Sequence, residues 1–273
     1  MSGDLVTSSS NPHLKKVRKL RQRKYRDKHQ AFFVEGIQPV TQAIEHAGGD
    51  IETFLVSPEV LGDHPVRELV AKQSARGTET IEVSAEAFAS ISNRDDPSGL
   101  GAIVTTAPAE LSSLRVEDDS LFVALDEVGN PGNLRAIVRT LDAVRGGGMI
   151  LMGTATDPYH PTAVKASMGT IFALPICRVV GFEELQAWAK AGGVTLITTS
   201  AKATTEHWTT DFPLPAVVVL GSEGRGLPPD VLSAGDLAVR IPIEGSASSL
   251  NLAIAASVLL YEVQRQRRRG RAR

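Results

Sequence analysis

The sequence predicts an α/β protein with two domains, and three observations support this prediction. Short apolar segments alternate with amphipathic helical segments along most of the 273 residues. Residues 107–120 lack such periodicity, so we expect a linker there, between an N-terminal domain at 1–110 and a C-terminal domain at 118–273. Two apolar strands near the C-terminus each lead into a loop rich in glycine or in serine and asparagine, as at the ligand-binding edge of a parallel sheet.

The expected N-terminal domain begins with a basic helix. Leu14, Val17 and Leu20 form one apolar stripe, and the other faces of this helix carry Lys and Arg. The pattern then predicts a small α/β domain, with strand 32–36, helix 37–47, strand 51–57, helix 66–75, strand 80–83, helix 85–91 and strand 101–106.

The expected C-terminal domain opens on a fully apolar strand, 121–126, followed by a helix that Asn133 would cap. Cys177, the one cysteine, lies in an apolar run, so we expect it in a strand; no internal disulfide can form. The remaining elements are helix 134–145, strand 149–152, helix 162–168 opened by Pro161, helix 182–191, strand 194–198, strand 217–220, strand 237–241 and a helix from Ser249.

The charge is unevenly placed, although the net charge is only −2. Residues 15–28 hold nine of the 29 basic residues against one acid, and residues 265–273 hold six more. A basic segment on an acidic body is typical of phosphate binding, so Lys15, Lys16, Arg18 and Lys19 are candidate phosphate contacts. The alternative is that both segments are simply solvated helix faces. No signal peptide or membrane-length apolar run is visible, which favours a cytoplasmic protein without a membrane partner.

Three motifs carry the candidate chemistry. Residues 217–227 read VVVLGSEGRGL, where glycines allow close approach of the backbone to a ligand. Residues 241–252 begin IPI and end SSLNL, and the free N–H groups at such a loop and helix start can anchor a ligand. Upstream, residues 130–140 read NPGNLRAIVRT. No cluster of metal-ligating residues accompanies them, so we expect no metal.

These motifs, in this order, resemble motifs 1, 2 and 3 of the SpoU-TrmH family of RNA ribose 2′-O-methyltransferases, in the SPOUT superfamily. The resemblance implies S-adenosylmethionine as the methyl donor, ribosomal RNA as partner, a homodimer paired through its C-terminal helix, and a parallel sheet containing a deep trefoil knot. It also implies that the smaller N-terminal α/β domain is similar to the ribosomal protein L30 and binds the RNA substrate.

The resemblance also implies roles for individual residues. In the catalytic group, Arg139 of motif 1 is expected to act on the ribose as a base or as a phosphate clamp, and the other members are Asn133, Glu223 and Asn251. Basic residues expected to contact RNA in addition to the helix at 15–19 are Arg135 and Lys165. The residues expected at the donor are Thr199, Leu220, Gly221, Ser222, Ile241, Pro242, Ile243, Ser249, Leu250 and Leu252.

Arg135 stands where family members usually have glycine, which leaves the details of the target in question. The resemblance implies 2′-O-methylation of a ribose in ribosomal RNA, and in 23S RNA in particular. The layout is similar to that of actinobacterial antibiotic-resistance methyltransferases, which suggests a role in resistance to a ribosome-targeting antibiotic. Two alternatives remain open: a transfer RNA 2′-O-methyltransferase, and a non-catalytic RNA-binding module that has kept the fold. The presence of Arg139, Glu223 and Asn251 argues against the second.

Overall fold

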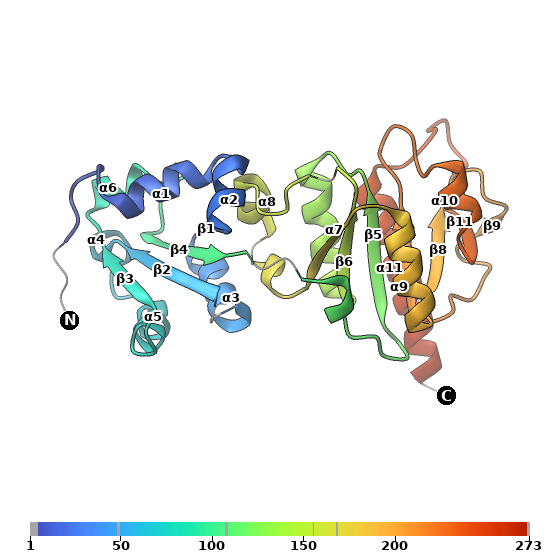
Figure 1. Ribbon diagram of the computed structural model, residues 1–273, viewed down its shortest axis with the longest axis horizontal. Helices are drawn as coiled ribbons and strands as arrows, with labels where there is room; N and C mark the ends of the chain where they lie inside the picture. The colour runs from blue at the N-terminus through green and yellow to red at the C-terminus, as the bar shows by residue number, and fades with distance from the viewer. Residues whose placement is uncertain (1–4, 48–49, 107–108, 155, 168, 272–273) are drawn as a thin grey trace. The chain divides into compact units, whose positions relative to one another are not determined.

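The computed structural model describes residues 5–47, 50–106, 109–154, 156–167 and 169–271. The chain forms two compact units, Met1–Ala107 with Asp157–Ala173, and Pro108–Thr156 with Leu174–Arg273. Figure 1 shows the elements of both units. Three expectations run beyond the described residues: the start of the expected linker at 107–108, Met168 at the end of the expected helix 162–168, and Arg273 at the end of the C-terminal basic segment.

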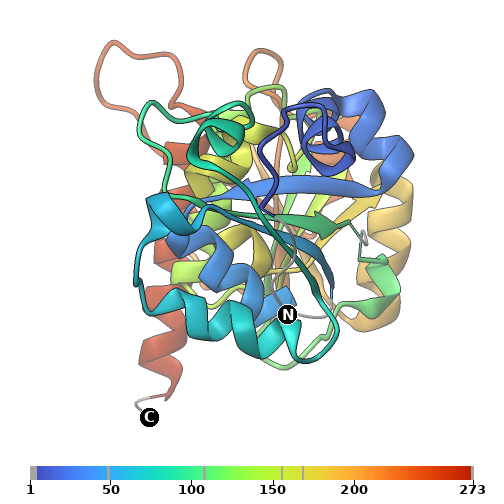
Figure 2. The same cartoon turned by 90° about the vertical axis from the view of Figure 1, so that its left-hand side faces the viewer.

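The first unit is a four-stranded sheet in the order β1-β4-β2-β3, antiparallel except for the β2–β3 pair. Helices α3 and α5 cover one face of the sheet, and α1 and α2 cover the other (Figure 2). Its elements are α1 (Pro12–Leu20), α2 (Arg23–His29), β1 (Ala31–Glu35), α3 (Ile37–Ala47), β2 (Ile51–Val56), α4 (Pro58–Leu61), α5 (Val66–Ser74), β3 (Glu79–Glu82), α6 (Ala85–Ala89), β4 (Leu100–Thr105), α8 (Pro161–Ser167) and the 3₁₀ helix η3 (Thr170–Phe172).

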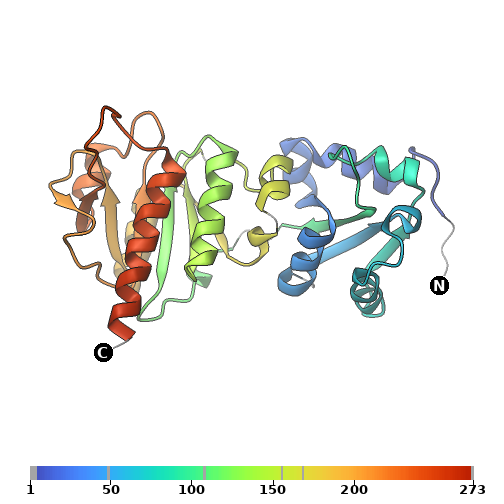
Figure 3. The same ribbon diagram turned by 180° about the vertical axis from the view of Figure 1, so that it is seen from behind.

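The second unit is a seven-stranded sheet in the order β7-β6-β5-β10-β8-β11-β9, and every neighbouring pair is parallel. Helices α7 and α11 lie side by side on one face, and α9 covers the other (Figure 3). Its elements are η2 (Leu111–Ser113), β5 (Leu121–Asp126), α7 (Pro131–Ala143), β6 (Gly148–Met152), β7 (Ile176–Val179), α9 (Phe182–Gly192), β8 (Thr195–Thr199), β9 (Thr205–Glu206), β10 (Ala216–Leu220), α10 (Pro229–Ser233), β11 (Leu237–Arg240) and α11 (Leu252–Arg271).

The core of the second unit follows from the apolar strands that the sequence predicted. Strands β5 and β10 are buried over nearly their whole length, as expected for a parallel sheet covered on both faces. Cys177 is fully buried in β7, and burial raises the pKa of its thiol to about 11. The prediction that this cysteine is a strand residue is therefore confirmed.

Residues 157–173, which we expected in the C-terminal domain, instead pack within the first unit. The ring of Phe32, on β1, packs against those of Tyr159 and Phe172, with centroid distances of 4.7 and 5.8 Å. Gly169 has a positive φ, and a Cβ added to it would lie 2.6 Å from the side chain of Gln42. The helical pattern at 162–167 could not have shown which sheet this helix covers.

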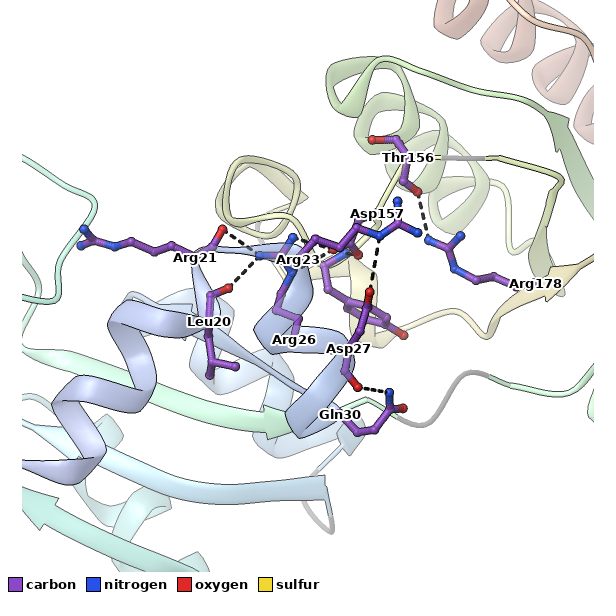
Figure 4. Close-up of polar contacts among 10 residues, drawn as sticks. Leu20, Arg21, Arg23, Arg26, Asp27, Gln30, Thr156, Asp157 and Arg178 are labelled. Atoms are coloured by element: carbon purple, nitrogen blue, oxygen red, sulfur yellow. Dashed lines mark hydrogen bonds and ion pairs between the residues drawn. The ribbon is translucent and has the colours of Figure 1, made fainter.

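A buried ion pair anchors the start of this segment (Figure 4). The guanidinium of Arg26, on α2, donates from Nε and Nη2 to Asp157 Oδ2 at 2.8 and 2.6 Å. Its Nη1 donates to the carbonyl oxygens of Leu20 and Arg21. The side chain of Arg26 is 3% exposed and that of Asp157 is 10% exposed, so both charges are largely shielded from water.

We expect a fragment of residues 1–110 to fold poorly, because without 157–173 it exposes Phe32 and leaves the Arg26 charge unpaired. Breaking a buried ion pair in this way costs about 3–5 kcal/mol. A matched fragment, with 157–173 joined through a flexible linker, should unfold cooperatively when followed by circular dichroism. Equal cooperativity of the two fragments would show that the segment adds nothing to this unit.

Candidate active site

The predicted motifs meet at one edge of the seven-stranded sheet because all its strands are parallel. Leu220 at the end of β10 pairs with Leu125 of β5, and Val239 of β11 pairs with Thr199 at the end of β8. The loops that leave β5, β10 and β11 therefore start from the same edge, which is where α/β proteins bind ligands. The loop after β5 leads into α7, which carries the motif at 130–140, and the other two are the glycine-rich loop 221–228 and the segment 241–251.

The glycine-rich loop is closed on itself. Ser222 and Gly226 bridge each other, and the Gly226 N–H donates to the Ser222 carbonyl at 2.9 Å. A Cβ added to Gly221 would lie 2.1 Å from the backbone carbon of Gly226 and 2.2 Å from the Leu227 nitrogen. Position 221 therefore accepts only glycine, while the carboxylate of Glu223 lies exposed at the tip of the loop.

Two asparagines from distant motifs are in contact. Asn251 Nδ2 donates to Asn133 Oδ1 at 3.1 Å, and Asn251 Oδ1 accepts from the Ala253 N–H at 2.9 Å. Asn133 is only 6% exposed, and its Nδ2 has no hydrogen-bond partner among the described residues. A buried amide with one unused donor is unusual and suits a site that completes its contacts with a ligand.

Two expected helix starts are corrected by the structure. Asn130, not Asn133, caps α7, since its Oδ1 accepts from the Gly132 N–H at 2.7 Å. Proline suits the first helical position, so the helix begins at Pro131 and Asn133 falls within its first turn. Helix α11 begins at Leu252 rather than Ser249, because the Asn251 side chain supplies its cap.

The segment expected at the donor lies at this same edge. Ile241, Pro242 and Ile243 are half-buried, and Ser249 and Leu250 are exposed, whereas Leu252 is buried. Backbone hydrogen bonds between described residues do not use the N–H groups of Ile241, Ile243 or Leu250, which are therefore available to a ligand. Thr199 is fixed by a 3.0 Å hydrogen bond from its Oγ1 to the Val219 carbonyl.

The two motif 1 arginines lie on one face of α7. Arg135 and Arg139 are four residues apart, so their side chains are neighbours on the helix surface. Arg139 is exposed and Arg135 is half-buried, and neither has an ion-pair partner among the described residues. Among the described residues, no ion pair joins Arg139 to Glu223. Two adjacent guanidinium groups without a counter-charge favour binding of an anion such as phosphate.

An acidic cluster at the end of β5 was not predicted from the sequence. Arg225 of the glycine-rich loop forms an ion pair with Glu127, which lies 98 residues earlier and has a positive φ of 47°. Burial raises the pKa of the neighbouring Asp126 carboxyl, Glu127 and Asp230 raise it further, and Arg225 opposes them. The only signal in the sequence was the position of two consecutive acids, Asp126 and Glu127, at the end of a buried strand.

The basic side chains of the first unit that were expected to contact RNA differ in whether they already bind groups of their own unit. Lys16 is paired with Glu52, and Arg18 donates to Ser90 Oγ and to the carbonyl of Ser9. The Lys19 ammonium lies 5.6 Å from the centroid of the Tyr25 ring, and Lys15 is exposed without an ion-pair partner among the described residues. Lys165, on α8, belongs to the first unit as well, where its Nζ donates to the Asn93 carbonyl at 3.1 Å.

The residues that the structure describes contain no group of three or more His, Cys, Asp and Glu side chains placed to hold a metal ion. No helix that they form is long and apolar enough to cross a membrane.

Both units match known protein families. Residues 120–261 match the SpoU rRNA Methylase family, and residues 11–102 match the MRM3-like substrate binding domain. The chain is 34% identical over 246 residues to the 23S rRNA (uridine(2479)-2′-O)-methyltransferase of Streptomyces viridochromogenes, an alignment that covers 88% of this chain and 84% of the relative.

Solved structures show the same likeness. The AdoMet-bound rRNA methyltransferase from Sinorhizobium meliloti has a TM-score of 0.86 and 36% identity, over 96% of this chain and 97% of that one. The SpoU methyltransferase AviRb from Streptomyces viridochromogenes has a TM-score of 0.84 and 32% identity, over 95% of this chain and 99% of that one.

We expect Asp126→Asn to raise the melting temperature at neutral pH by a few degrees. The raised pKa means that the folded state disfavours the carboxylate relative to the unfolded state, so the ionised form lowers stability above the folded-state pKa. As the pH falls through that pKa, the wild type takes up the proton and the difference should vanish near the ordinary value of 3.8.

Thermal unfolding between pH 7.5 and 4 measures this, with Asp63→Asn as the control because that carboxylate is fully exposed. An Asp126→Asn protein that is less stable than the wild type at pH 7.5 would contradict the expected sign.

Proposed function

Because the chain belongs to the SpoU rRNA methylase family, we propose that it methylates a ribose 2′-hydroxyl in 23S ribosomal RNA. The family resemblance expected from the three motifs is thereby confirmed, as are the enzyme class and S-adenosylmethionine as the methyl donor. The observation that carries the proposal is the meeting of the three motifs at one sheet edge, with Asn133 bonded to Asn251 across 118 residues of sequence.

We assign the donor to this edge of the sheet. We propose that the free N–H groups of Ile241, Ile243 and Leu250 hold it through hydrogen bonds, and that Leu220, Gly221, Ser222 and Pro242 lie against it. Thr199 and Ser249 supply hydroxyl groups beside them. S-adenosylmethionine supplies an electrophilic methyl group on a sulfonium centre. The absence of a side chain at Gly221 keeps the loop closed beside the site.

For the acceptor, which is the ribose 2′-hydroxyl, alignment with the methyl group matters more than a strong base. An alcohol is a poor nucleophile, so placing the 2′-hydroxyl in line with the methyl group is the main task of the protein. We propose that Arg139, with Arg135 beside it, binds the phosphate next to the target ribose and so fixes the hydroxyl. A free guanidinium remains protonated in proteins, which makes this role physically easier than that of a base. Asn133, Glu223 and Asn251 then complete the acceptor side.

We expect Arg139→Ala to lower kcat at least 100-fold while leaving donor affinity unchanged, because the lost group acts on the RNA and not on the donor. Methyl transfer from labelled donor to 23S rRNA measures the first effect, and equilibrium dialysis measures the second. Arg139→Lys should recover little, since a clamp on phosphate depends on the planar guanidinium. Wild-type turnover in the alanine variant would remove Arg139 from the mechanism.

The target is tested with the same assay. Labelled donor should be incubated with 23S rRNA, 16S rRNA and transfer RNA, and the modified ribose mapped by pauses in primer extension. Methylation of transfer RNA alone would favour the transfer RNA alternative. Donor binding without transfer to any of the three would favour a non-catalytic RNA-binding module.

We propose that the first unit, which is similar to L30-like RNA binders by the family resemblance, brings the RNA to the site. Lys15, Lys24 and Lys28 support this role, because they are exposed on α1 and α2 and have no ion-pair partner among the described residues. Lys16, Arg18 and Lys19 are engaged within the unit and contribute less freely.

We expect replacement of Lys15, Lys24 and Lys28 by Gln to weaken RNA binding, because each ammonium neutralises a phosphate and releases its counterion. The slope of log affinity against log salt should fall by about 1 for each phosphate that is no longer neutralised. The same replacement of Lys16, which faces Glu52, serves as the matched control and should change the slope less. Unchanged slopes in both proteins would show that the basic helices are solvated faces.

We propose further that the enzyme is a homodimer that pairs through α11. Ile254 and Tyr261 are 54% and 57% exposed on this helix, and Leu250 is 38% exposed just before it. Exposed apolar side chains in one stripe are typical of an interface. Ala256 and Leu259, by contrast, are buried within their own chain, so a charge at either position would test folding instead of pairing.

We expect Ile254→Glu with Tyr261→Glu to produce a folded monomer and to abolish methyl transfer. Val180→Glu is the matched control, because Val180 is 91% exposed in the same unit but directly follows β7 and is not part of α11. Sedimentation velocity at micromolar concentration distinguishes the states. A monomeric, active wild type would rule out the dimer.

Three further properties are proposed from the family resemblance. The deep trefoil knot is supported by the position of β10 between β5 and β8 and by the packing of α11 against α7. An experimental structure whose backbone forms no knot would exclude it.

A cytoplasmic location follows from an rRNA substrate, and cell fractionation tests it. An antibiotic-resistance role is tested by expressing the chain and measuring growth on ribosome-targeting drugs.

A further inference from the structure

The loop between α6 and β4 in the first unit is held more firmly than an ordinary surface loop. Arg21 Nη2 donates to the carbonyls of Ile91 and Ser92 at 3.1 and 3.0 Å. Lys165 Nζ donates to the next carbonyl, that of Asn93, at 3.1 Å. Three successive carbonyl oxygens are thus bound by two cationic side chains from separate parts of the chain.

A buried carboxylate holds the other side of the same loop. Glu35, at the end of β1, is 8% exposed. Its Oε1 accepts from the Ser92 hydroxyl, and its Oε2 accepts from the Asn93 N–H at 2.9 Å. Burial of a carboxylate is unfavourable unless it is fully hydrogen-bonded, so these two bonds also fix where the loop must lie. Arg94 adds a bond from Nη2 to the Glu35 carbonyl at 3.3 Å.

The result is a rigid backbone that presents one unused side chain. Both backbone groups of Asn93 are bonded, whereas its exposed side-chain amide has no hydrogen-bond partner among the described residues. An amide offers a donor and an acceptor side by side, which matches the hydrogen-bonding edge of a nucleobase. Preorganised groups of this kind bind with little loss of conformational entropy.

The charges near the loop favour a base over a phosphate as the ligand. Arg21, Arg94 and Lys165 bring positive charge, but Glu35, Asp95 and Asp96 balance it. A phosphate would gain little net attraction there. Sequence-specific RNA recognition, in contrast, relies on hydrogen bonds to the edges of unpaired bases.

We propose that residues 92–94 form a base-reading loop in which the Asn93 amide binds the edge of an unpaired base in the RNA substrate. Glu35, Arg21 and Lys165 are positioning residues that act through the loop. This assignment rests on the proposed RNA substrate, and it gives Lys165 a role in fixing the loop instead of the direct phosphate contact that the sequence suggested.

The test is the affinity of the full-length protein for deproteinised bacterial 23S rRNA, measured without donor by filter binding. Asn93→Ala keeps both backbone bonds of the loop, and we expect it to weaken binding about 5- to 20-fold. Dimethyl sulfate footprinting should show an unpaired base that is protected by the wild type and not by the variant. Gln73→Ala, which removes an amide from α5 in the same unit, is the matched control and should bind as the wild type does.

A double-mutant cycle separates positioning from general structure. Glu35→Gln should weaken RNA binding in the wild type but add nothing in the Asn93→Ala background, because it acts only through that amide. Lys165→Met, which loosens the same loop from the other side, gives a second cycle if Glu35→Gln does not fold. Wild-type RNA affinity in Asn93→Ala, or equal losses in both backgrounds, would overturn the assignment. Failure of the wild type to methylate any rRNA would instead count against the proposed function, since binding is measured separately.

Discussion

The packing of α11 against α7 is the constraint on which the candidate site depends. Three contacts join the helices along their length: Asn251 with Asn133 at the sheet edge, Ser257 with Thr140 in the middle, and Arg267 with the Val144 carbonyl at the far end. The last contact places a guanidinium at the C-terminus of α7, where unpaired carbonyls favour a cation. Since α7 carries motif 1 and α11 continues from motif 3, any displacement of one helix would separate the two halves of the site.

How far the sequence predicted this structure depends on whether the determining contacts are local. Strand 121–126 has the expected bounds because an uninterrupted apolar run is sufficient to define a buried parallel strand. The expected start of α7 was wrong because two residues suit a helix cap, Asn130 and Asn133. Pro131, which directly follows Asn130 and suits the first helical position, decides between them. The basic helix with its apolar stripe is confirmed as α1, in which Leu14, Val17 and Leu20 are buried, whereas the second helix α2, after Arg21 and Gln22, was not expected. The two-residue strand β9 is too short to give any pattern.

Contacts between distant residues were the part that no periodicity could show. The motifs located the glycine-rich loop and both asparagines, but not the Arg225–Glu127 pair, which joins positions 98 residues apart. In the same way, the segment 157–173 reads as an ordinary helix start and only its buried partners assign it to the first unit. Arg26 and Asp157 show why: a buried ion pair is a poor source of stability, but it strongly penalises any arrangement that leaves one charge alone. It therefore specifies where the segment enters the unit.

The basic side chains of the first unit divide into two groups, which would contribute separately to the affinity and to the sequence specificity of RNA binding. Several basic residues of the N-terminal segment bind groups of their own unit. Lys16 pairs with Glu52, Arg26 pairs with Asp157, and Arg21 donates to backbone carbonyls, so these side chains stabilise the structure and are less available to RNA. The lysines that we propose to attract phosphates are exposed on α1 and α2 without an ion-pair partner among the described residues, and such contacts carry no sequence information. In this proposal the sequence is read by neutral groups, which cations bound to backbone carbonyls hold in fixed positions. A basic segment in a sequence can thus serve recognition in two ways, and only the hydrogen-bond partners of each side chain tell which.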